Sequence, residues 1–85
     1  MDRDQALVRG REAGQRLAWG DAYTSLSLAG ESSPLAGADL ELLAAAAYLL
    51  GHVDECRQAL QRAHDAYIAA EDVRRAARCL FWIAF

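Results

Sequence analysis

The side chains best suited to metal chemistry in this chain are two cysteines and two histidines. Cys56 stands one helical turn after His52, and His64 and Cys79 complete the set. A structural zinc site usually needs four such ligands at close spacing, often with a C-x2-C pair, and no such pair occurs here. We therefore expect no metal site and no cofactor, and we interpret both cysteines as small hydrophobic side chains on apolar helix faces.

The serines do not fall into an arrangement typical of nucleophilic catalysis. Ser25 and Ser27 are predicted on a helix face, and Ser32 and Ser33 in a loop. Catalysis requires a nucleophile, a base and an orienting group that converge on a pocket, and the small stack of two helical hairpins that the apolar spacing of this chain predicts offers little room for one. The sequence therefore predicts a protein that is not an enzyme.

Charged residues give the chain a net charge of −3, and all nine basic residues are arginines. Three of them, Arg74, Arg75 and Arg78, form a basic turn, but Glu71 and Asp72 adjoin it. We interpret this stretch as a solvent-exposed helix face whose acidic and basic side chains pair with one another. Glu71 and Arg75 stand one turn apart and are able to form such a pair. The acidic balance favours neither a nucleic-acid-binding surface nor binding to an anionic membrane.

The sequence features that report on location favour the cytoplasm. The N-terminal residues Met-Asp-Arg-Asp are acidic and no apolar run follows them, so we expect no signal peptide. The longest apolar run, from Leu42 to Leu50, is too short to cross a bilayer. Two cysteines are too few for a disulfide framework, which makes a reducing compartment the simplest expectation.

Apolar residues recur three and four positions apart along the chain, which predicts amphipathic helices. Hydrophobic residues make up 54% of the 85-residue chain, and its only Pro is Pro34; many of these residues are Ala, the best helix former. The predicted fold class is all-α, with five antiparallel helices. They are expected at 2–17, capped by Asp2 or Asp4, at 19–29, at 39–50, capped by Asp39, at 53–70 and at 73–85. The large residues expected in the core are Leu7, Leu17, Trp19, Leu26, Leu40, Leu43, Leu60, Tyr67, Phe81 and Trp82.

Residues of similar size recur at one offset, which indicates an internal repeat. Six pairs stand 34 positions apart, and the bulky ones, Trp19 with Val53 and Leu26 with Leu60, are the least expected by chance. A period near 34 with paired helices is typical of helical solenoids. The other pairs are Gly10 with Ala44, Ala13 with Ala47, Ala22 with Cys56, and Ala29 with Ala63.

The spacing within each repeat resembles the tetratricopeptide repeat, a paired-helix unit with the signature W-x2-L-G-x2-Y, then A-x3-F, then P. The first repeat carries Gly10-x2-Ala13 and Ala22-x3-Leu26, and the second carries Leu40-x2-Leu43-Ala44-x2-Ala47 and Cys56-x3-Leu60. Ala13 and Ala47 replace the aromatic residue of the signature. The resemblance implies a single tetratricopeptide-like domain over 1–85, with repeat one at about 3–36, repeat two at about 37–72 and the first helix of a third repeat at about 73–85.

Longer stretches narrow this resemblance further. Trp19-Gly20-Asp21-Ala22-Tyr23, Asp39-Leu40-Glu41-Leu42-Leu43-Ala44 and Arg75-Ala76-Ala77-Arg78-Cys79-Leu80-Phe81-Trp82 look like the opening repeats of large bacterial LuxR-type transcriptional regulators. In that family a tetratricopeptide region senses or docks a partner and a C-terminal helix-turn-helix, which is not in this chain, binds DNA. The resemblance implies a protein-interaction or sensing module that does not itself bind nucleic acid. The alternative is a free-standing small helical protein that acts as an oligomeric structural or adaptor element.

The resemblance also implies where a partner protein would bind. In tetratricopeptide solenoids the first helix of each repeat lines a concave surface that holds partners. The residues expected on that surface are Arg11, Gln15, Glu41, Ala45, Tyr48 and Trp82. The C-terminal helix is apolar around most of its circumference, so Phe81, Trp82 and Phe85 are expected to mediate self-association, most simply as a twofold dimer. Trp82 and Phe85 can equally be core residues that await a further helix.

Overall fold

The computed structural model describes residues 2–84, and the regular structure in that range consists of five helices. The predicted all-α class with five helices is confirmed. The helices are α1 (Arg3–Gln15), α2 (Trp19–Ser32), α3 (Gly37–Leu49), α4 (Val53–Ala69) and α5 (Val73–Ala84).

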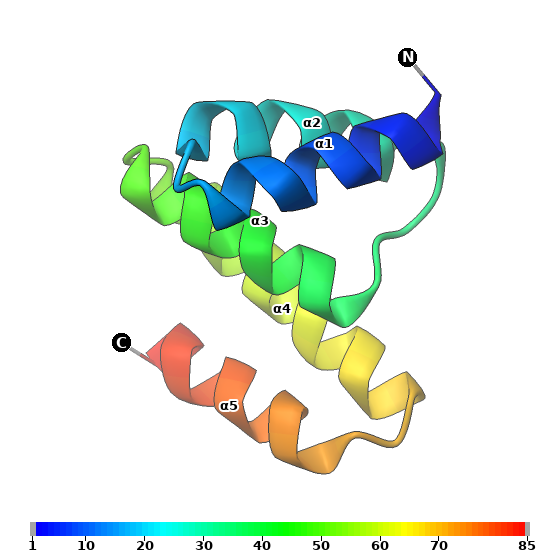
Figure 1. Ribbon diagram of the computed structural model, residues 1–85. Coiled ribbons are helices and arrows are strands. Elements are labelled where there is room, and N and C mark those ends of the chain that lie inside the picture. Colours follow the sequence, from blue (N-terminus) through cyan, green and yellow to red (C-terminus); the bar gives the residue numbers. More distant parts are fainter. Residues whose placement is uncertain (1, 85) are drawn as a thin grey trace.

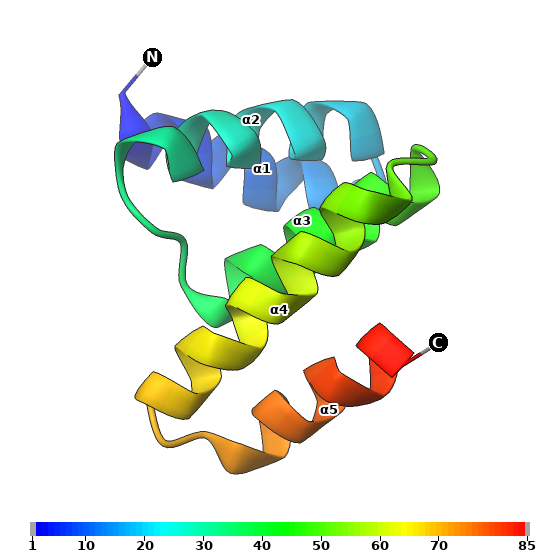
Figure 2. The same ribbon diagram turned by 180° about the vertical axis from the view of Figure 1, so that it is seen from behind.

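The helices are arranged as two antiparallel hairpins followed by a single helix (Figure 1). Helices α1 and α2 form the first hairpin, and α3 and α4 form the second. Helix α3 packs against both α2 and α1, while α5 runs back along α4 on the far side of the second hairpin (Figure 2). Because α3 lies between the first hairpin and α4, it contributes to the surfaces on both of its sides.

The two hairpins repeat at the period that the sequence predicts. Helix α1 begins at residue 3 and α3 at residue 37, and α2 begins at residue 19 and α4 at residue 53, so both pairs are 34 residues apart. Each helix begins within one position of the residue predicted for it, except α3. Helix α3 begins at Gly37 and takes Ala36 as its N-cap, so the expectation that Asp39 caps it is wrong.

Three helices end in the same backbone turn. In each turn one residue has a left-handed φ: 61° at Leu17, 85° at Gly51 and 60° at Glu71. The N–H of the residue that follows donates to a carbonyl five positions earlier, at 2.8 Å in all three turns, which is the pattern of a Schellman C-cap. The turn directs the side chain of Leu17 outward, where it is 67% exposed, so the expectation that Leu17 belongs to the core is wrong.

Small residues allow the helices to approach closely around a few large ones. Leu26 is fully buried, and a Cβ placed on Gly10 of α1 would lie 2.7 Å from its Cγ. A Cβ placed on Gly37, at the start of α3, would lie 2.6 Å from the ring of Tyr67 of α4. Of the large residues expected in the core, Phe81 and Trp82 are instead exposed. Their helix α5 buries only Ala76 and Cys79, because it packs on α4 with a single face.

Candidate interaction surface

A bidentate ion pair ties α1 to α3. Arg11 donates from Nε to Oδ1 of Asp39 at 2.8 Å and from Nη2 to Oδ2 at 2.7 Å. The Asp39 side chain is only 8% exposed, and its hydrogen bond and negative charge raise the pKa of the Arg11 guanidinium. The guanidinium of Arg11, expected to face a partner, therefore serves to join the two hairpins.

A second network joins α3, α4 and α5 through the carboxylate of Glu41. Arg78 of α5 donates from Nη2 to Oε1 at 2.6 Å and from Nε to Oε2 at 3.1 Å, and the hydroxyl of Tyr67 of α4 also donates to Oε1. Burial, together with the hydrogen bond to Glu41 and its charge, raises the pKa of Tyr67 to about 12. The expected pair of Glu71 with Arg75 does not form; Arg75 instead binds Asp72, three residues before it, at 2.9 Å.

Beside this network lies a groove of about 570 Å³ between α3, α4 and α5. Apolar side chains make up most of its lining, with Tyr48 of α3 and Trp82 of α5 at its rim, where they are 64% and 54% exposed. The charged lining residues are Glu41, which is already paired, and Arg57. The remaining lining residues are Ala44, Ala45, Val53, Cys56, Leu60 and Ile83. We name this cleft the α3–α5 groove.

The α3–α5 groove brings together four of the six residues predicted to bind a partner: Glu41, Ala45, Tyr48 and Trp82. The other two, Arg11 and Gln15, lie on α1 outside the groove, both exposed to solvent. This division arises because α5 packs beside α4, so α3 and α5 face a common space that α1 does not reach.

The residues expected to mediate self-association lie at the end of α5. The ring of Phe81 meets the ring of Trp82 edge-on at a centroid distance of 5.5 Å, and Phe81 is 56% exposed. Phe85, the third of these residues, lies outside the described residues.

The cysteines of the structure are poor nucleophiles at neutral pH. Cys56 lines the α3–α5 groove, and Cys79 of α5 is fully buried. Burial raises the pKa of both thiols, and a protonated thiol neither attacks an electrophile nor binds a metal well. Within residues 2–84 there is no group of three or more His, Cys, Asp and Glu side chains close enough together to hold a metal ion.

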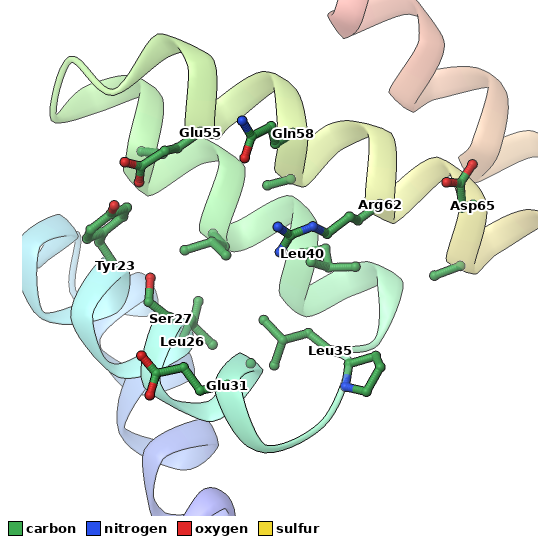
Figure 3. A pocket seen from close by; sticks show the side chains of 16 residues that line it. Tyr23, Leu26, Ser27, Glu31, Leu35, Leu40, Glu55, Gln58, Arg62 and Asp65 are labelled. Atoms are coloured by element: carbon green, nitrogen blue, oxygen red, sulfur yellow. The ribbon is translucent and has the colours of Figure 1, made fainter.

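A second hollow, of about 710 Å³, lies on the opposite side of α3, between α2 and α4 (Figure 3). Sequence reasoning missed it, because the predicted site was confined to the first helix of each repeat. The signal available in the sequence was the polar face of α4, where Glu55, Gln58, Arg62 and Asp65 recur three and four positions apart. We name this cleft the α2–α4 groove.

No helix in the described part of the chain is both long and apolar enough to cross a membrane. Comparison of the chain with models of protein families, with curated proteins and with solved structures finds no match.

Proposed function

We propose that this chain is a non-catalytic protein-interaction module that holds an apolar segment of another polypeptide in the α3–α5 groove. The observation that carries this proposal is the groove itself, a largely apolar cleft of about 570 Å³ with Tyr48 and Trp82 at its rim. Aromatic side chains that flank a desolvated cleft are the commonest anchors of binding energy at protein interfaces.

The Glu41 network supports the proposal because it forms the groove before a partner arrives. Arg78 and Tyr67 bind the same carboxylate, so α5 and α4 are both fixed relative to α3 beside the cleft. A preformed site loses less conformational entropy on binding than one that must be assembled. Binding energy from the apolar contacts is then available for affinity.

The charges that line the α3–α5 groove favour one kind of polypeptide segment as its occupant. Arg78 neutralises Glu41, while Arg57 has no ion-pair partner among the described residues. The groove therefore presents one uncompensated positive charge beside an apolar surface, which favours a segment that carries a carboxylate next to its apolar side chains. We propose an acidic amphipathic segment of a partner protein as the occupant.

The recurrence of helices and turns supports a broader assignment. Helices α1 and α3, and helices α2 and α4, begin 34 residues apart, and the turns at Leu17 and Gly51 repeat at the same interval. We propose that the module is a tetratricopeptide-like portion of a bacterial LuxR-type regulator and that it acts in the cytoplasm. In this proposal the chain contributes the contact with a partner, and nucleic acid is bound elsewhere.

The outer face of α5 favours a second candidate function, that of an oligomeric structural or adaptor element. Val73, Leu80 and Phe81 are all exposed, and together with Ala77 and Ala84 they form a stripe spaced three and four apart. Such a stripe on a solvent-facing helix is typical of a helix–helix contact. Two copies that pair through this stripe would form a closed twofold dimer.

A peptide titration tests the first candidate. The probe is a synthetic amphipathic peptide of Leu and Glu, followed by NMR chemical shifts of the ¹⁵N-labelled chain. We expect the largest shifts at Ala45, Cys56 and Ile83, and a roughly tenfold loss of affinity for Tyr48→Ala or Trp82→Ala. Leu28→Ala, which removes an exposed leucine from α2, is the control. Equal affinity in all variants would contradict the proposal.

Light scattering distinguishes the second candidate. If the outer face of α5 pairs two copies, the wild-type chain will run as a dimer and Leu80→Glu will run as a monomer, with no change for Leu28→Glu. A monomer at high concentration, in which Leu80→Glu has no effect, would exclude the oligomeric element and leave the partner-binding module in place.

A further inference from the structure

The α2–α4 groove is a cleft with an apolar floor and two polar walls (Figure 3). Leu40 and Leu43 of α3, with Leu26 of α2, form its floor. In Figure 2, α2 and α4 run in the same direction and diverge toward their C-terminal ends. Its volume of about 710 Å³ falls within the range of about 300–1,000 Å³ that is usual for binding sites.

Both ends of the α2–α4 groove are held in place by fixed contacts. At one end the ring of Tyr23 stacks on the ring of His52, with centroids 5.1 Å apart and planes inclined by 14°. At the other end Pro34 and Leu35 cross from the first hairpin to the second, with Leu35 buried. Arg3 of α1 further secures this connection by donating to the carbonyl of Pro34 at 3.0 Å.

The walls of the groove carry an excess of negative charge. Three carboxylates line it, Glu31 from α2 and Glu55 and Asp65 from α4, against one guanidinium, that of Arg62. Asp65 is engaged locally, since its Oδ1 lies 3.1 Å from Nδ1 of His64. Neither Glu31 nor Glu55 has an ion-pair partner within residues 2–84. One unpaired carboxylate therefore stands on each wall, above an apolar floor.

We propose that the α2–α4 groove is a second binding surface, whose occupant is a polypeptide segment with apolar side chains on one face and basic side chains flanking it. The apolar side chains would lie over Leu40 and Leu43, which keep a small exposed surface, and the basic side chains would meet Glu31 and Glu55. Complementary charges on both sides of an apolar strip fix the register in which the segment binds and favour a segment that carries positive charge. This surface is independent of the α3–α5 groove, which lies across α3 and favours the opposite charge.

Two synthetic amphipathic peptides of the same length test the proposal, one of Leu and Lys and the other of Leu and Glu, each added to the full ¹⁵N-labelled chain. We expect the Leu/Lys peptide to shift the amides of Ser27, Gly30 and Gln58. We also expect its affinity to fall by roughly tenfold in Glu31→Gln/Glu55→Gln and to weaken with added salt. Arg62→Gln should instead tighten binding, which a purely structural effect of substitution would not do.

Matched controls separate this surface from general charge attraction. The pair Glu12→Gln/Asp54→Asn removes the same charge from exposed positions outside the groove and should leave the affinity unchanged. An equal loss in the control pair, shifts that centre on Tyr48 and Cys56, or no shift with the Leu/Lys peptide would each overturn the proposal. Concentration-dependent shifts of Ser27, Gly30 and Gln58 without any peptide, with a dimer by light scattering that persists in Leu80→Glu, would show that a second copy occupies the groove and would overturn it as well.

Discussion

At the scale of single residues, Asp39 and Glu41 do most to position the helices. They stand two positions apart in the first turns of α3, and each binds an arginine from a different neighbour, Arg11 of α1 and Arg78 of α5. The sequence places all four on predicted helices but cannot pair them. The partners are 28 and 37 residues apart, and the pairing depends on how the helices cross.

Removal of Arg11 tests how much its ion pair with Asp39 stabilises the packing of α3 on α1. In Arg11→Ala the carboxylate of Asp39, which is almost fully buried in the wild-type chain, loses both charge-assisted hydrogen bonds. We expect the free energy of unfolding to fall by about 1–3 kcal/mol in urea denaturation. Arg9→Ala, on the exposed side of the same helix, should change it by less than about 0.5 kcal/mol. Equal effects of the two substitutions would show that the ion pair contributes nothing specific.

Tyr67 gives the fold a dependence on alkaline pH. Its pKa is raised to about 12 in the folded chain, above an unperturbed value of about 10. A raised pKa means that the stabilising contribution is complete below about pH 10 and is lost as the pH rises toward about 12. The contribution is on the order of 2 kcal/mol.

Urea denaturation across this pH range checks the role of Tyr67. The stability of the wild type should fall more steeply with pH than that of Tyr67→Phe, which has no hydroxyl to ionise. The comparison removes the effect of Cys56 and Cys79, because the same thiols titrate in both proteins. Parallel curves for the two proteins would refute this assignment.

At the scale of helices and turns, some of the glycines mark positions where helices touch. Gly10 and Gly20 both lie within helices, yet a Cβ on Gly10 would lie 2.7 Å from Leu26, whereas a Cβ on Gly20 would meet nothing within 4 Å. Gly10 is a small residue on the apolar stripe of its predicted helix, which predicts a close approach of the partner helix. The sequence offers no such reason for Gly14, which the structure places against Leu42. Contacts of this kind depend on which turn of each helix lies at the crossing, which spacing alone does not determine.

The two glycines give opposite predictions for the same substitution. Gly20→Ala should stabilise the chain by about 0.5–1 kcal/mol, because Ala is the better helix former and has room. Gly10→Ala should destabilise it by about 1–3 kcal/mol, because the fully buried Leu26 cannot move aside without strain. Thermal unfolding measured by circular dichroism checks both. A gain in stability for Gly10→Ala would mean that the hairpin is packed more loosely than described.

The C-terminal turn of α1 is the point at which sequence and backbone disagree most. The equivalent turn after α3 has Gly51 at its left-handed position, but the turn after α1 has Leu17, at a φ of 61°. Apolar spacing predicted Leu17 in the core, since periodicity does not reveal where a helix stops. Leu17 stands 34 residues before Gly51. The repeat therefore predicts a left-handed residue at position 17 only if the period is applied to the turns as well as to the helices.

Substitution of Leu17 by glycine should therefore be favourable. Leu17→Gly removes the steric cost of a left-handed residue, about 1 kcal/mol, and sacrifices little packing because the side chain is exposed. We expect a higher midpoint in urea denaturation, whereas Leu7→Gly, at a buried position within α1, should be strongly destabilising. A lower midpoint for Leu17→Gly would show that its side chain has a role that exposure does not reveal.

At the scale of the whole molecule, α3 separates two clefts of opposite character. The α3–α5 groove is apolar with an uncompensated arginine, and the α2–α4 groove is apolar with two uncompensated carboxylates. The all-α class and the five helices could be predicted from apolar spacing and the repeat, whereas the four predicted residues that line the α3–α5 groove came only from the resemblance to tetratricopeptide repeats. The clefts themselves could not, because their existence depends on how far α2 and α5 stand from the second hairpin.

The central claim is that the α3–α5 groove receives a partner segment, and a spin-labelled peptide tests it most directly. A nitroxide on the Leu/Glu peptide should broaden the amide signals of Ala45, Cys56 and Ile83 and leave those of Ala6 and Ser27 sharp. Reduction of the nitroxide should restore the signals. Uniform broadening, or broadening centred on α1 and α2, would contradict the account.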